Sequence, residues 1–365
     1  MNIIKNFFII SFSCIFSIIL IEVIYNIFFR VNVIGDKLDR ISFYKKYQNQ
    51  ELDRSLPIRH KFNGGECVRR GLLTKKGRMN WHPRIGANDN DVDIDCINEL
   101  FTSKTTNVVF FGGSSMFNHE TPNYLTSIEY YAFGDKFEKF RSINLANSGA
   151  RMSNNLSSFV EHIPKINNVD YVIFMDGVND FTGVQLGANP IYDTYWAQGV
   201  KQRINNPKVV ILEKIIEKSI FFEFLFKYVF GYKSIRDKSN VRFVDENEIE
   251  VAAADYTYRK KIIEILCKNF SIKCIFTLQP AIFFDKTRKS FNEKIYKYYQ
   301  KNLFQENLNL YSIGYEKIKL ENTNIIDLSK IFNGNENVFI DASHFNKDGS
   351  KIIGEKFYQI LQENN

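Results

Sequence analysis

The sequence of 365 residues contains no block of like charge, no internal repeat and no linker rich in proline, glycine or serine. Its 48 lysine and arginine residues are scattered among 41 aspartate and glutamate residues. This dispersion argues against a nucleic-acid-binding surface, which gathers basic residues on one face. With 44% hydrophobic and 24% charged residues, the chain can form one large globular domain, alone or with appendages.

Metal-ligand patterns are also missing. The pair His119-Glu120 lacks the second histidine of a zinc-protease helix, and His60, His82 and His162 have no partners at ligand spacing. We therefore expect no metal ion.

Cysteine is scarce, with five in the chain. Cys14 lies in an apolar segment, which leaves Cys67, Cys96, Cys267 and Cys274. Their even number permits two disulfides, and four free buried thiols are an equal alternative. Cys267 and Cys274 stand too far from other ligands for a zinc site.

One segment is apolar throughout. Residues 7–29 read FFIISFSCIFSIILIEVIYNIFF, with Glu22 as the only charge. A helix of about 20 apolar residues crosses a bilayer. A cleaved signal peptide has a shorter apolar stretch that ends in small residues, which this segment lacks. We predict an uncleaved single-pass anchor over residues 1–30.

The orientation of that anchor is read from two conflicting signals. Lys5 precedes the apolar segment, whereas several basic residues follow it, and the positive-inside rule would then keep the main domain in the cytosol. Large domains translocate largely regardless of such charges, and the even number of cysteines outside the apolar segment, which permits disulfides, favours an oxidising compartment. We predict an extracytoplasmic domain.

Downstream, short apolar runs alternate with longer helical patterns. The runs cover residues 107–111, 142–145, 171–175, 274–278 and 324–328, and the helical stretches cover 154–166, 246–269, 288–319 and 348–362. Continuous apolar strands are typical of a parallel sheet that is buried on both faces. The pattern predicts an α/β fold, a three-layer α/β/α sandwich around a five-stranded parallel sheet.

The rest of the chain divides around this core. Residues 31–105 are polar and mixed, and predict an irregular N-terminal extension to the main domain at 106–365. Residues 182–245 form an insertion, in which an apolar helix face recurs over residues 212–228. Core burial of that face is favoured, and a lid or a contact with the bilayer is the alternative.

Ligands of open α/β sheets bind beyond the carboxyl ends of the strands. The segments that follow the strands are Gly112–Ser115, Asn147–Ala150, Asp176–Asp180 and, ahead of the last helix, Asp341–Phe345. Any one of these segments is usually a turn or a cap. All four in this order, each after a predicted strand, predict a catalytic site.

This ordered set resembles the SGNH hydrolase superfamily, the GDSL-type esterases and acyltransferases. The matching positions are Ser114, Gly149, Asn179 and His344, with Asp341 three residues before the histidine, and the resemblance covers about residues 105–363. It implies a flavodoxin-like SGNH fold and a serine-dependent ester hydrolase that needs no cofactor.

The expected chemistry explains these residue types. A serine hydroxyl needs a neighbouring base, here His344, and Asp341 would fix the imidazole tautomer. The intermediate carries an oxyanion, for which the backbone N–H groups of Ser114 and Gly149 and the side-chain amide of Asn179 would supply donors. Glycine at 149 also lets the backbone approach the substrate closely.

The sequence departs from the family pattern at the nucleophile. Gly113 replaces the usual aspartate, a variant that resembles membrane-anchored bacterial members. Ser115 is a rival nucleophile, and a helix cap is the favoured interpretation of it. Gln279 ends the fourth strand and either lines the pocket or only marks the turn. The motif Gly-x-Ser-x-Gly is absent around Ser114, which argues against the nucleophile-elbow hydrolases.

The resemblance to anchored relatives favours an O-acyl substrate, specifically an O-acetylated cell-envelope polysaccharide. An O-acyltransferase on the same kind of glycan is an alternative, as is a lipase or thioesterase that acts on membrane lipid. The non-enzyme alternative is an inactive glycan-binding or assembly component. Such a component has no need for Asp341 and His344 together.

Overall fold

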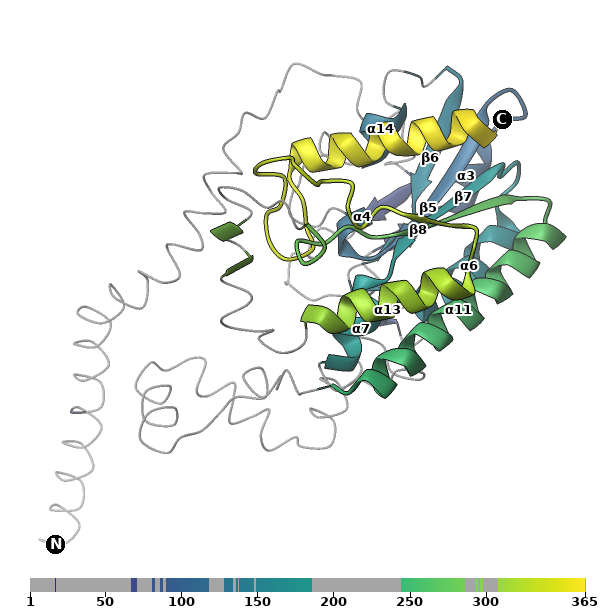
Figure 1. Cartoon of the computed structure of the whole chain (residues 1–365). Helices are drawn as coiled ribbons and strands as arrows, with labels where there is room; N and C mark the ends of the chain where they lie inside the picture. The colour runs from purple at the N-terminus through teal and green to yellow at the C-terminus, as the bar shows by residue number, and fades with distance from the viewer. Residues whose placement is uncertain are drawn as a thin grey trace, which may run out of the picture. The chain divides into compact units, whose positions relative to one another are not determined.

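Figure 1 shows the chain as a computed structural model. The structure describes Ser17 and residues 67–70, 81–82, 86–87, 90–117, 128–133, 136, 138–147, 149–185, 244–285, 293–294, 296–297 and 308–364. The chain divides into two compact units, Met1–Leu52 with Gly199–Ser239 and Asp53–Gln198 with Asn240–Asn365. Apart from Ser17, the described residues belong to the second unit, and the fold below is that of this unit.

A five-stranded parallel sheet forms the centre, in the order β6-β5-β7-β8-β9. Its strands are β5 (Thr106–Gly112), β6 (Phe140–Asn144), β7 (Tyr171–Asp176), β8 (Lys273–Leu278) and β9 (Ile325–Asp327). Each predicted apolar run forms one of these strands, and the central β7 is buried along its whole length. Of the strands of this sheet, β6 is the second in chain order and lies at one edge beside β5, the first, which is the flavodoxin-like order.

The side chains of each strand alternate between two helical layers. On one face Phe111, Phe174 and Phe276 stack across three neighbouring strands, with successive ring centroids 5.2 and 4.9 Å apart. On the other face Phe110 lies 5.9 Å from the ring of Phe133 and 5.8 Å from that of Phe357. The predicted three-layer α/β/α arrangement is confirmed.

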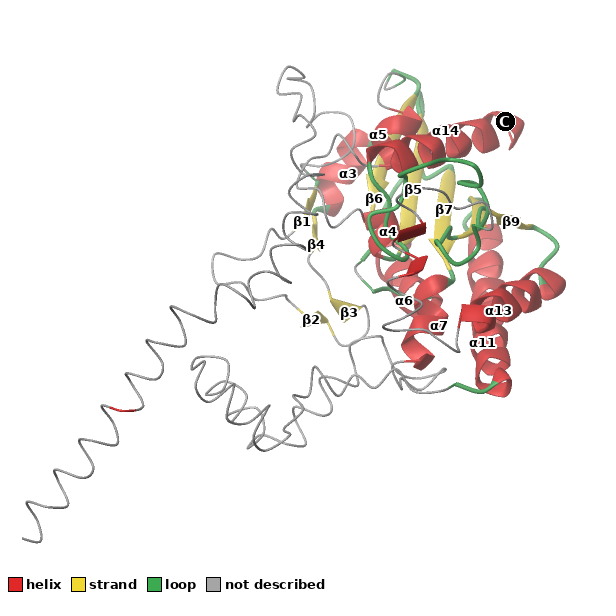
Figure 2. Cartoon of the chain, turned by 60° about the vertical axis from the view of Figure 1, so that its left-hand side comes forward, coloured by secondary structure: helices red, strands yellow, loops and turns green. Residues whose placement is uncertain are grey.

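The two layers differ in size (Figures 1 and 2). Over Phe111 lie α6 (Met152–His162), α7 (Val178–Gln185), α11 (Glu246–Asn269) and α13 (Leu308–Glu321). The opposite face carries α5 (Ile128–Phe133) and α14 (Lys347–Asn364), which pack against each other. The start of α11 is set by a capping box, in which the Asp245 carboxylate accepts the Glu248 N–H at 2.8 Å.

Two helices end or begin away from their predicted bounds. The helix predicted to reach residue 166 ends at His162, and a 3₁₀ turn, η2 (Ile163–Lys165), follows. Pro164 explains this end, because its ring cannot continue an α-helix. The helix predicted over 288–319 is α13 only from Leu308 onward, and the described residues 293–294 and 296–297 are also helical.

The predicted N-terminal extension reaches into the core. Its short strands pair antiparallel, β1 (Val68–Arg70) with β4 (Asn90–Val92) and β2 (Trp81–His82) with β3 (Gly86–Ala87). They precede α3 (Ile94–Leu100), where Ile97, like Phe101 after it, is buried in the same cluster as Phe111. The prediction of an irregular segment was therefore wrong near its end, because apolar residues there recur at helical spacing.

The structure forms both disulfides that the cysteine count permits. Cys67 pairs with Cys96, which joins the start of β1 to α3. Cys267 in the last turn of α11 pairs with Cys274 in β8. The alternative of four free thiols does not hold in this structure.

Two sequence predictions fall on other parts of the chain. Among the described residues no helix is long and apolar enough to cross a membrane. The anchor predicted over residues 7–29 lies outside them except for Ser17, and so does the apolar helix face predicted over residues 212–228. The insertion at 182–245 is described only at its two ends.

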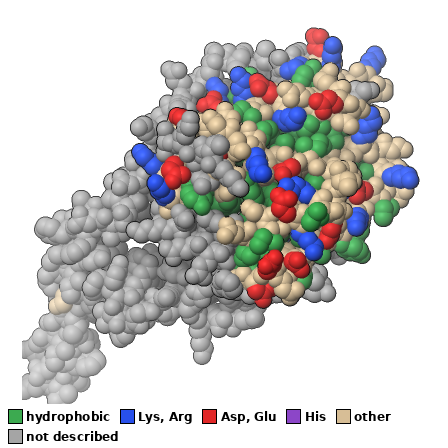
Figure 3. Space-filling model, viewed as in Figure 1, with side chains coloured by type: hydrophobic (Ala, Val, Ile, Leu, Met, Phe, Trp, Pro, Cys, Tyr) green, Lys and Arg blue, Asp and Glu red, His purple; other side chains and the backbone are tan. Residues whose placement is uncertain are grey.

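Charges of both signs are interspersed over the described surface in Figure 3. Some form ion pairs one helical turn apart, such as Arg259 with Asp255 at 2.7 Å and Lys319 with Glu316 at 2.6 Å. The mixed surface matches the scattered charges of the sequence.

Candidate active site

The predicted site residues lie beyond the carboxyl ends of the strands. Ser114 opens the short helix α4 (Ser114–Phe117) two residues after β5, and Asn179 lies in the first turn of α7, three residues after β7. Gly149 follows β6, and Asp341 and His344 lie in the loop before α14. Because all five strands are parallel, these segments meet at one edge of the sheet.

Three of these side chains form a hydrogen-bonded chain. His344 Nε2 lies 2.6 Å from Ser114 Oγ, although the two residues are 230 positions apart in sequence. His344 Nδ1 lies 2.6 Å from Asp341 Oδ2. The side chains of Asp341 and His344 keep 16% and 22% of their surface exposed, so the group lies at the surface of the fold rather than inside it.

The loop that carries the histidine is held on both sides. Phe339 and Phe345 form an isolated antiparallel bridge, and their rings pack 5.2 and 5.4 Å from that of Phe332. Within the loop, Asp341 Oδ1 accepts the N–H groups of Ser343 at 2.9 Å and His344 at 2.8 Å. The aspartate thus uses one oxygen to shape the turn and the other to hold the imidazole.

Asp341 is a stable carboxylate in this setting. Its partial burial raises its pKa, but the charge of His344 and the hydrogen bonds from His344 and Ser343 outweigh this effect and hold the pKa below the ordinary value. An anion at this position favours a proton on the facing nitrogen, His344 Nδ1. His344 Nε2 is then free to accept a proton from the Ser114 hydroxyl.

Gly149 adopts a conformation that favours glycine. Its φ of 68° lies in the left-handed region, where a side chain would be strained. The turn around it is anchored to β5, because the Asn147 N–H donates to the Gly112 carbonyl at 3.1 Å. The Ala150 N–H closes the turn on the Asn147 carbonyl, also at 3.1 Å.

The close approach of Asn179 explains the departure at Gly113. The Asn179 amide donates one N–H to the Ala150 carbonyl at 3.0 Å. A Cβ atom on residue 113 would collide with the nitrogen of that amide. Glycine at this position therefore lets the Asn179 amide sit against the backbone that leads into Ser114, and its second N–H has no part in the bond to Ala150.

A buried carboxylate underlies this corner of the site. Asp180 Oδ1 accepts the Met152 N–H at 3.1 Å and lies 3.9 Å from Arg151 Nε, at the start of α6. Burial raises its pKa from 3.8 to about 6, against the lowering effects of the Arg151 charge and the Met152 N–H. Asp176 is also buried, and its pKa is raised well above 3.8 by burial and by the charge of Asp180. Neither carboxyl group belongs to the predicted set of site residues.

Ser115 differs from its predicted role as a helix cap, and Gln279, which follows β8, has side-chain contacts that neither of its two predicted roles includes. Ser115 is the second residue of α4 rather than its cap, and its hydroxyl donates to the Ser343 carbonyl at 2.8 Å. Gln279 is 2% exposed, so it lies beneath the surface, and its amide donates to Ser115 Oγ at 2.6 Å. Neither partnership leaves a spacing signal, because the partners are 228 and 164 residues apart.

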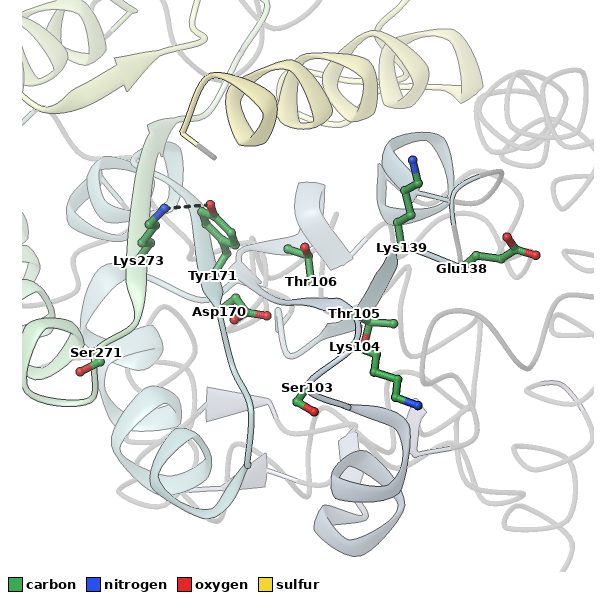
Figure 4. A pocket seen from close by; sticks show the side chains of 10 residues that line it. All are labelled: Ser103, Lys104, Thr105, Thr106, Glu138, Lys139, Asp170, Tyr171, Ser271 and Lys273. Carbon is green, nitrogen blue, oxygen red and sulfur yellow. Dashed lines mark hydrogen bonds between the residues drawn. The ribbon is translucent and has the colours of Figure 1, made fainter.

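A polar pocket of about 590 Å³ lies at the opposite, amino end of the sheet (Figure 4). It is lined by residues that precede or begin the strands, among them Lys139, Tyr171 and Lys273. The Lys273 ammonium donates to the Tyr171 hydroxyl at 3.2 Å and to the Asn364 carbonyl at 2.7 Å. This pocket contains none of the predicted site residues. Among the described residues no group of three His, Cys, Asp or Glu side chains could hold a metal ion.

Comparison with known proteins gives similarity of structure without similarity of sequence. No family model and no curated protein sequence matches the chain. Among solved structures, an acetyl xylan esterase is 14% identical, with 70% of this chain and 99% of that chain covered and a TM-score of 0.38. A lipase/acylhydrolase from Enterococcus faecalis is 15% identical, with coverage of 71% and 97% and a TM-score of 0.39.

A GDSL-like lipase from Bacteroides thetaiotaomicron is 13% identical, with 72% of this chain and 91% of that chain covered and a TM-score of 0.36. At these identities and TM-scores the matches carry no argument about activity. The chain is similar in structure to these proteins.

Proposed function

We propose that this protein is a serine-dependent ester hydrolase. The observation that carries the proposal is the chain of two 2.6 Å contacts, from Ser114 Oγ to His344 Nε2 and from His344 Nδ1 to Asp341 Oδ2. A nucleophile, a base and a group that orients the base, each within hydrogen-bond reach of the next, are what acyl transfer through serine requires.

The first half of the reaction acylates Ser114. Its oxygen attacks the carbonyl carbon of the ester while its proton passes to His344 Nε2, and Asp341 stabilises the imidazolium. The tetrahedral intermediate collapses when the bond to the alcohol oxygen breaks, and His344 returns the proton to that leaving oxygen. In the second half, His344 takes a proton from water, the hydroxide attacks the acyl carbon, and Ser114 leaves with its proton restored.

The oxyanion of each tetrahedral intermediate needs preorganised donors. We assign this role to the backbone N–H groups of Ser114 and Gly149 and to the Asn179 amide. The left-handed turn at Gly149 and the approach of Asn179 to Gly113 support the assignment. Asp180 accepts a hydrogen bond from the Met152 N–H, three residues after Gly149, and so helps to fix the segment that follows this turn.

For the substrate, we propose an O-acyl group, specifically an O-acetyl group, of a cell-envelope glycan. The support is the resemblance of Gly113-Ser114 and the other blocks to anchored bacterial members of the GDSL-type family. Release of acetate from an acetylated polysaccharide, compared with release of fatty acid from a long-chain ester, tests this proposal. Preference for the long-chain ester would replace it with a lipase.

For localisation, we propose a single-pass anchor at residues 7–29 with the described domain outside the cytoplasm. The disulfides Cys67–Cys96 and Cys267–Cys274 support this side of the membrane, because such bonds persist in oxidising compartments. A topology reporter fused after Asn365 should be active only outside the cytoplasm. A cytoplasmic signal would overturn the proposed orientation.

Labelling with a fluorophosphonate tests the enzyme class, since this probe reacts with an activated serine whatever the substrate. The wild-type protein should be labelled, and Ser114→Ala should abolish the labelling completely. Ser115→Ala is the matched control and should still be labelled at saturating probe. An unlabelled wild-type protein, or labelling that survives Ser114→Ala, would contradict the proposed function.

A further inference from the structure

The serine next to the proposed nucleophile faces the interior. Ser115 is 3% exposed, whereas Ser114 is half-buried at the surface of the site. The Ser115 hydroxyl donates to the carbonyl of Ser343, the residue directly before His344. Two adjacent hydroxyls of α4 therefore reach the same loop, one at the imidazole and the other at the backbone.

Gln279 completes this contact from a third segment. Its Nε2 donates to Ser115 Oγ at 2.6 Å and to the Ser343 carbonyl at 3.2 Å. A carbonyl oxygen only accepts, so the amide atom that faces it must be the nitrogen. Ser115 accepts from Gln279 and donates to Ser343, so every bond of the triangle has a donor and an acceptor.

The backbone of Gln279 gives this triangle a rigid base. The Gln279 N–H donates to the Asp176 carbonyl at 2.8 Å, which continues the pairing of β8 with β7. The Gln279 carbonyl accepts the buried Tyr315 hydroxyl at 2.9 Å. Since both backbone groups are fixed, the Gln279 side chain extends from the sheet rather than from a loop.

The Ser343 carbonyl belongs to the peptide group that joins Ser343 to His344, so hydrogen bonds that fix this carbonyl also restrict His344. Its own residue and His344 both donate backbone N–H groups to Asp341 Oδ1, so the turn behaves as one closed unit. Movement of the Ser343 carbonyl would therefore move the imidazole relative to Ser114. A displacement of about 1 Å between reacting groups can reduce a rate by about a hundredfold.

We propose that Ser115 and Gln279 are positioning residues that hold the His344 turn at hydrogen-bond distance from Ser114. The inference rests on the proposed function, in which Ser114 and His344 react. It explains why a second serine follows the nucleophile and why a buried glutamine directly follows β8.

The test compares Ser115→Ala, Gln279→Met and the double variant with the wild-type protein. Each single variant should lower kcat on an aryl acetate, and the rate constant of fluorophosphonate inactivation, by about tenfold to a hundredfold, with KM nearly unchanged. The double variant should lose little more than the worse single variant, because both side chains act on one carbonyl.

Thr277→Val is the matched control. Thr277 lies two residues before Gln279, is fully buried, and donates its hydroxyl to the Phe174 carbonyl at 2.9 Å. Its loss removes the same kind of hydrogen bond from the same strand and should lower the melting temperature without lowering kcat. An equal loss of kcat in this control would assign the effect to general loosening and overturn the proposal.

Hydrogen exchange of the segment around Ser343 and His344 provides a readout that needs no catalysis. Both positioning variants should exchange faster there than the wild-type protein and the Thr277→Val control. Unchanged exchange together with unchanged rates would overturn the positioning role and leave the proposed function intact. If the wild-type protein has no esterase activity but the variants still accelerate hydrogen exchange, the proposed function would be overturned. The contact of Ser115 and Gln279 with the Ser343 carbonyl would then be supported.

Discussion

The two ends of the parallel sheet both carry polar side chains, but these side chains have different partners. At the carboxyl end, Ser114 and His344 are hydrogen-bonded to each other, although Ser114 lies just after β5 and His344 lies just before α14. At the amino end, the pocket of about 590 Å³ is lined by polar groups, and Lys273 is bonded to the chain's own Asn364 carbonyl.

This contrast shows that a cavity alone does not locate chemistry. The amino-end pocket has volume and charge, but Lys273 and Tyr171 are bonded there to each other and to the last residue of α14. The carboxyl end joins a nucleophile, a base and a carboxylate in series.

The largest effect is expected from Asp341→Asn. The side-chain oxygen of the amide can still accept the backbone N–H groups of Ser343 and His344. The amide NH₂ group would then face His344 Nδ1, where it can only donate a hydrogen bond. The proton of the imidazole then moves to Nε2, which can no longer accept from Ser114. We expect kcat to fall about ten-thousandfold, measured on an aryl acetate, with little change in melting temperature.

Asp327→Asn is the control for that substitution. Asp327 ends β9 at the same edge of the sheet, where its carboxylate pairs with Lys319 at 3.0 Å. This variant should keep the wild-type kcat. A comparable loss in both variants would mean that charge at this edge, rather than the tautomer of His344, governs the rate.

The next effect concerns Asn179. If its amide donates to the oxyanion, Asn179→Ala should lower kcat by about a hundredfold to a thousandfold, with KM little changed, because the bond strengthens as charge develops. Asn179→Asp should be at least as damaging, since it places an anion at that point. Melting temperature is measured alongside, because the amide also bonds the Ala150 carbonyl. An unstable variant with full kcat would remove Asn179 from the proposed oxyanion hole.

A smaller effect is expected on stability, from Asp180. Its pKa is raised from 3.8 to about 6, so the folded state binds a proton across this window that the unfolded state has released. The free energy of unfolding should therefore fall as pH rises from about 4 to 6. Asp180→Asn keeps an acceptor for the Met152 N–H and should remove this part of the fall between about pH 4 and pH 6, on the order of 2 kcal/mol. Denaturant unfolding of both proteins at about pH 4 and pH 6 measures this difference. An equal fall in the free energy of unfolding in both proteins would show that Asp180 is not the titrating group.

The smallest effect is expected at the amino-end pocket. Lys104 and Lys139 are exposed there, and their joint substitution by alanine should change kcat and KM by less than about twofold. Kinetics on an anionic and a neutral ester would check this. A KM that rises for the anionic ester alone would mean that the amino-end pocket takes part in substrate binding. The two ends of the sheet would then not differ in function as described.

The sheet could be predicted from sequence because its strands carry a signal that does not depend on distant residues. Buried parallel strands such as β7 are apolar along their length, and the polar residues of the site follow them directly. The end of α6 shows the limit of apolar periodicity, since the pattern continues to residue 166 whereas Pro164 ends the helix at His162. The core role of Ile97 and Phe101 was missed because the surrounding segment is polar on average.

The site could be predicted in part for the same reason. Ser114 and Asn179 stand in short motifs just after strands, and His344 stands in one ahead of the last helix, and a linear sequence displays all three motifs. The contacts of Ser115 and Gln279 could not be predicted, because a bond to a backbone carbonyl 228 or 64 residues away imposes no side-chain pattern. The disulfide pairing stayed open too, since four cysteines permit several pairings and only the fold brings two of them together.

The most direct test of the central claim is to trap the acyl-enzyme. The protein is mixed with an aryl acetate and quenched in acid within the first turnover, and the peptide that carries both adjacent serines is sequenced by mass spectrometry. We predict an acetyl group on Ser114 of the wild-type protein that is absent from the Ser114→Ala variant. An acetyl group on Ser115, or aryl acetate turnover with no acetylated serine, would contradict the account.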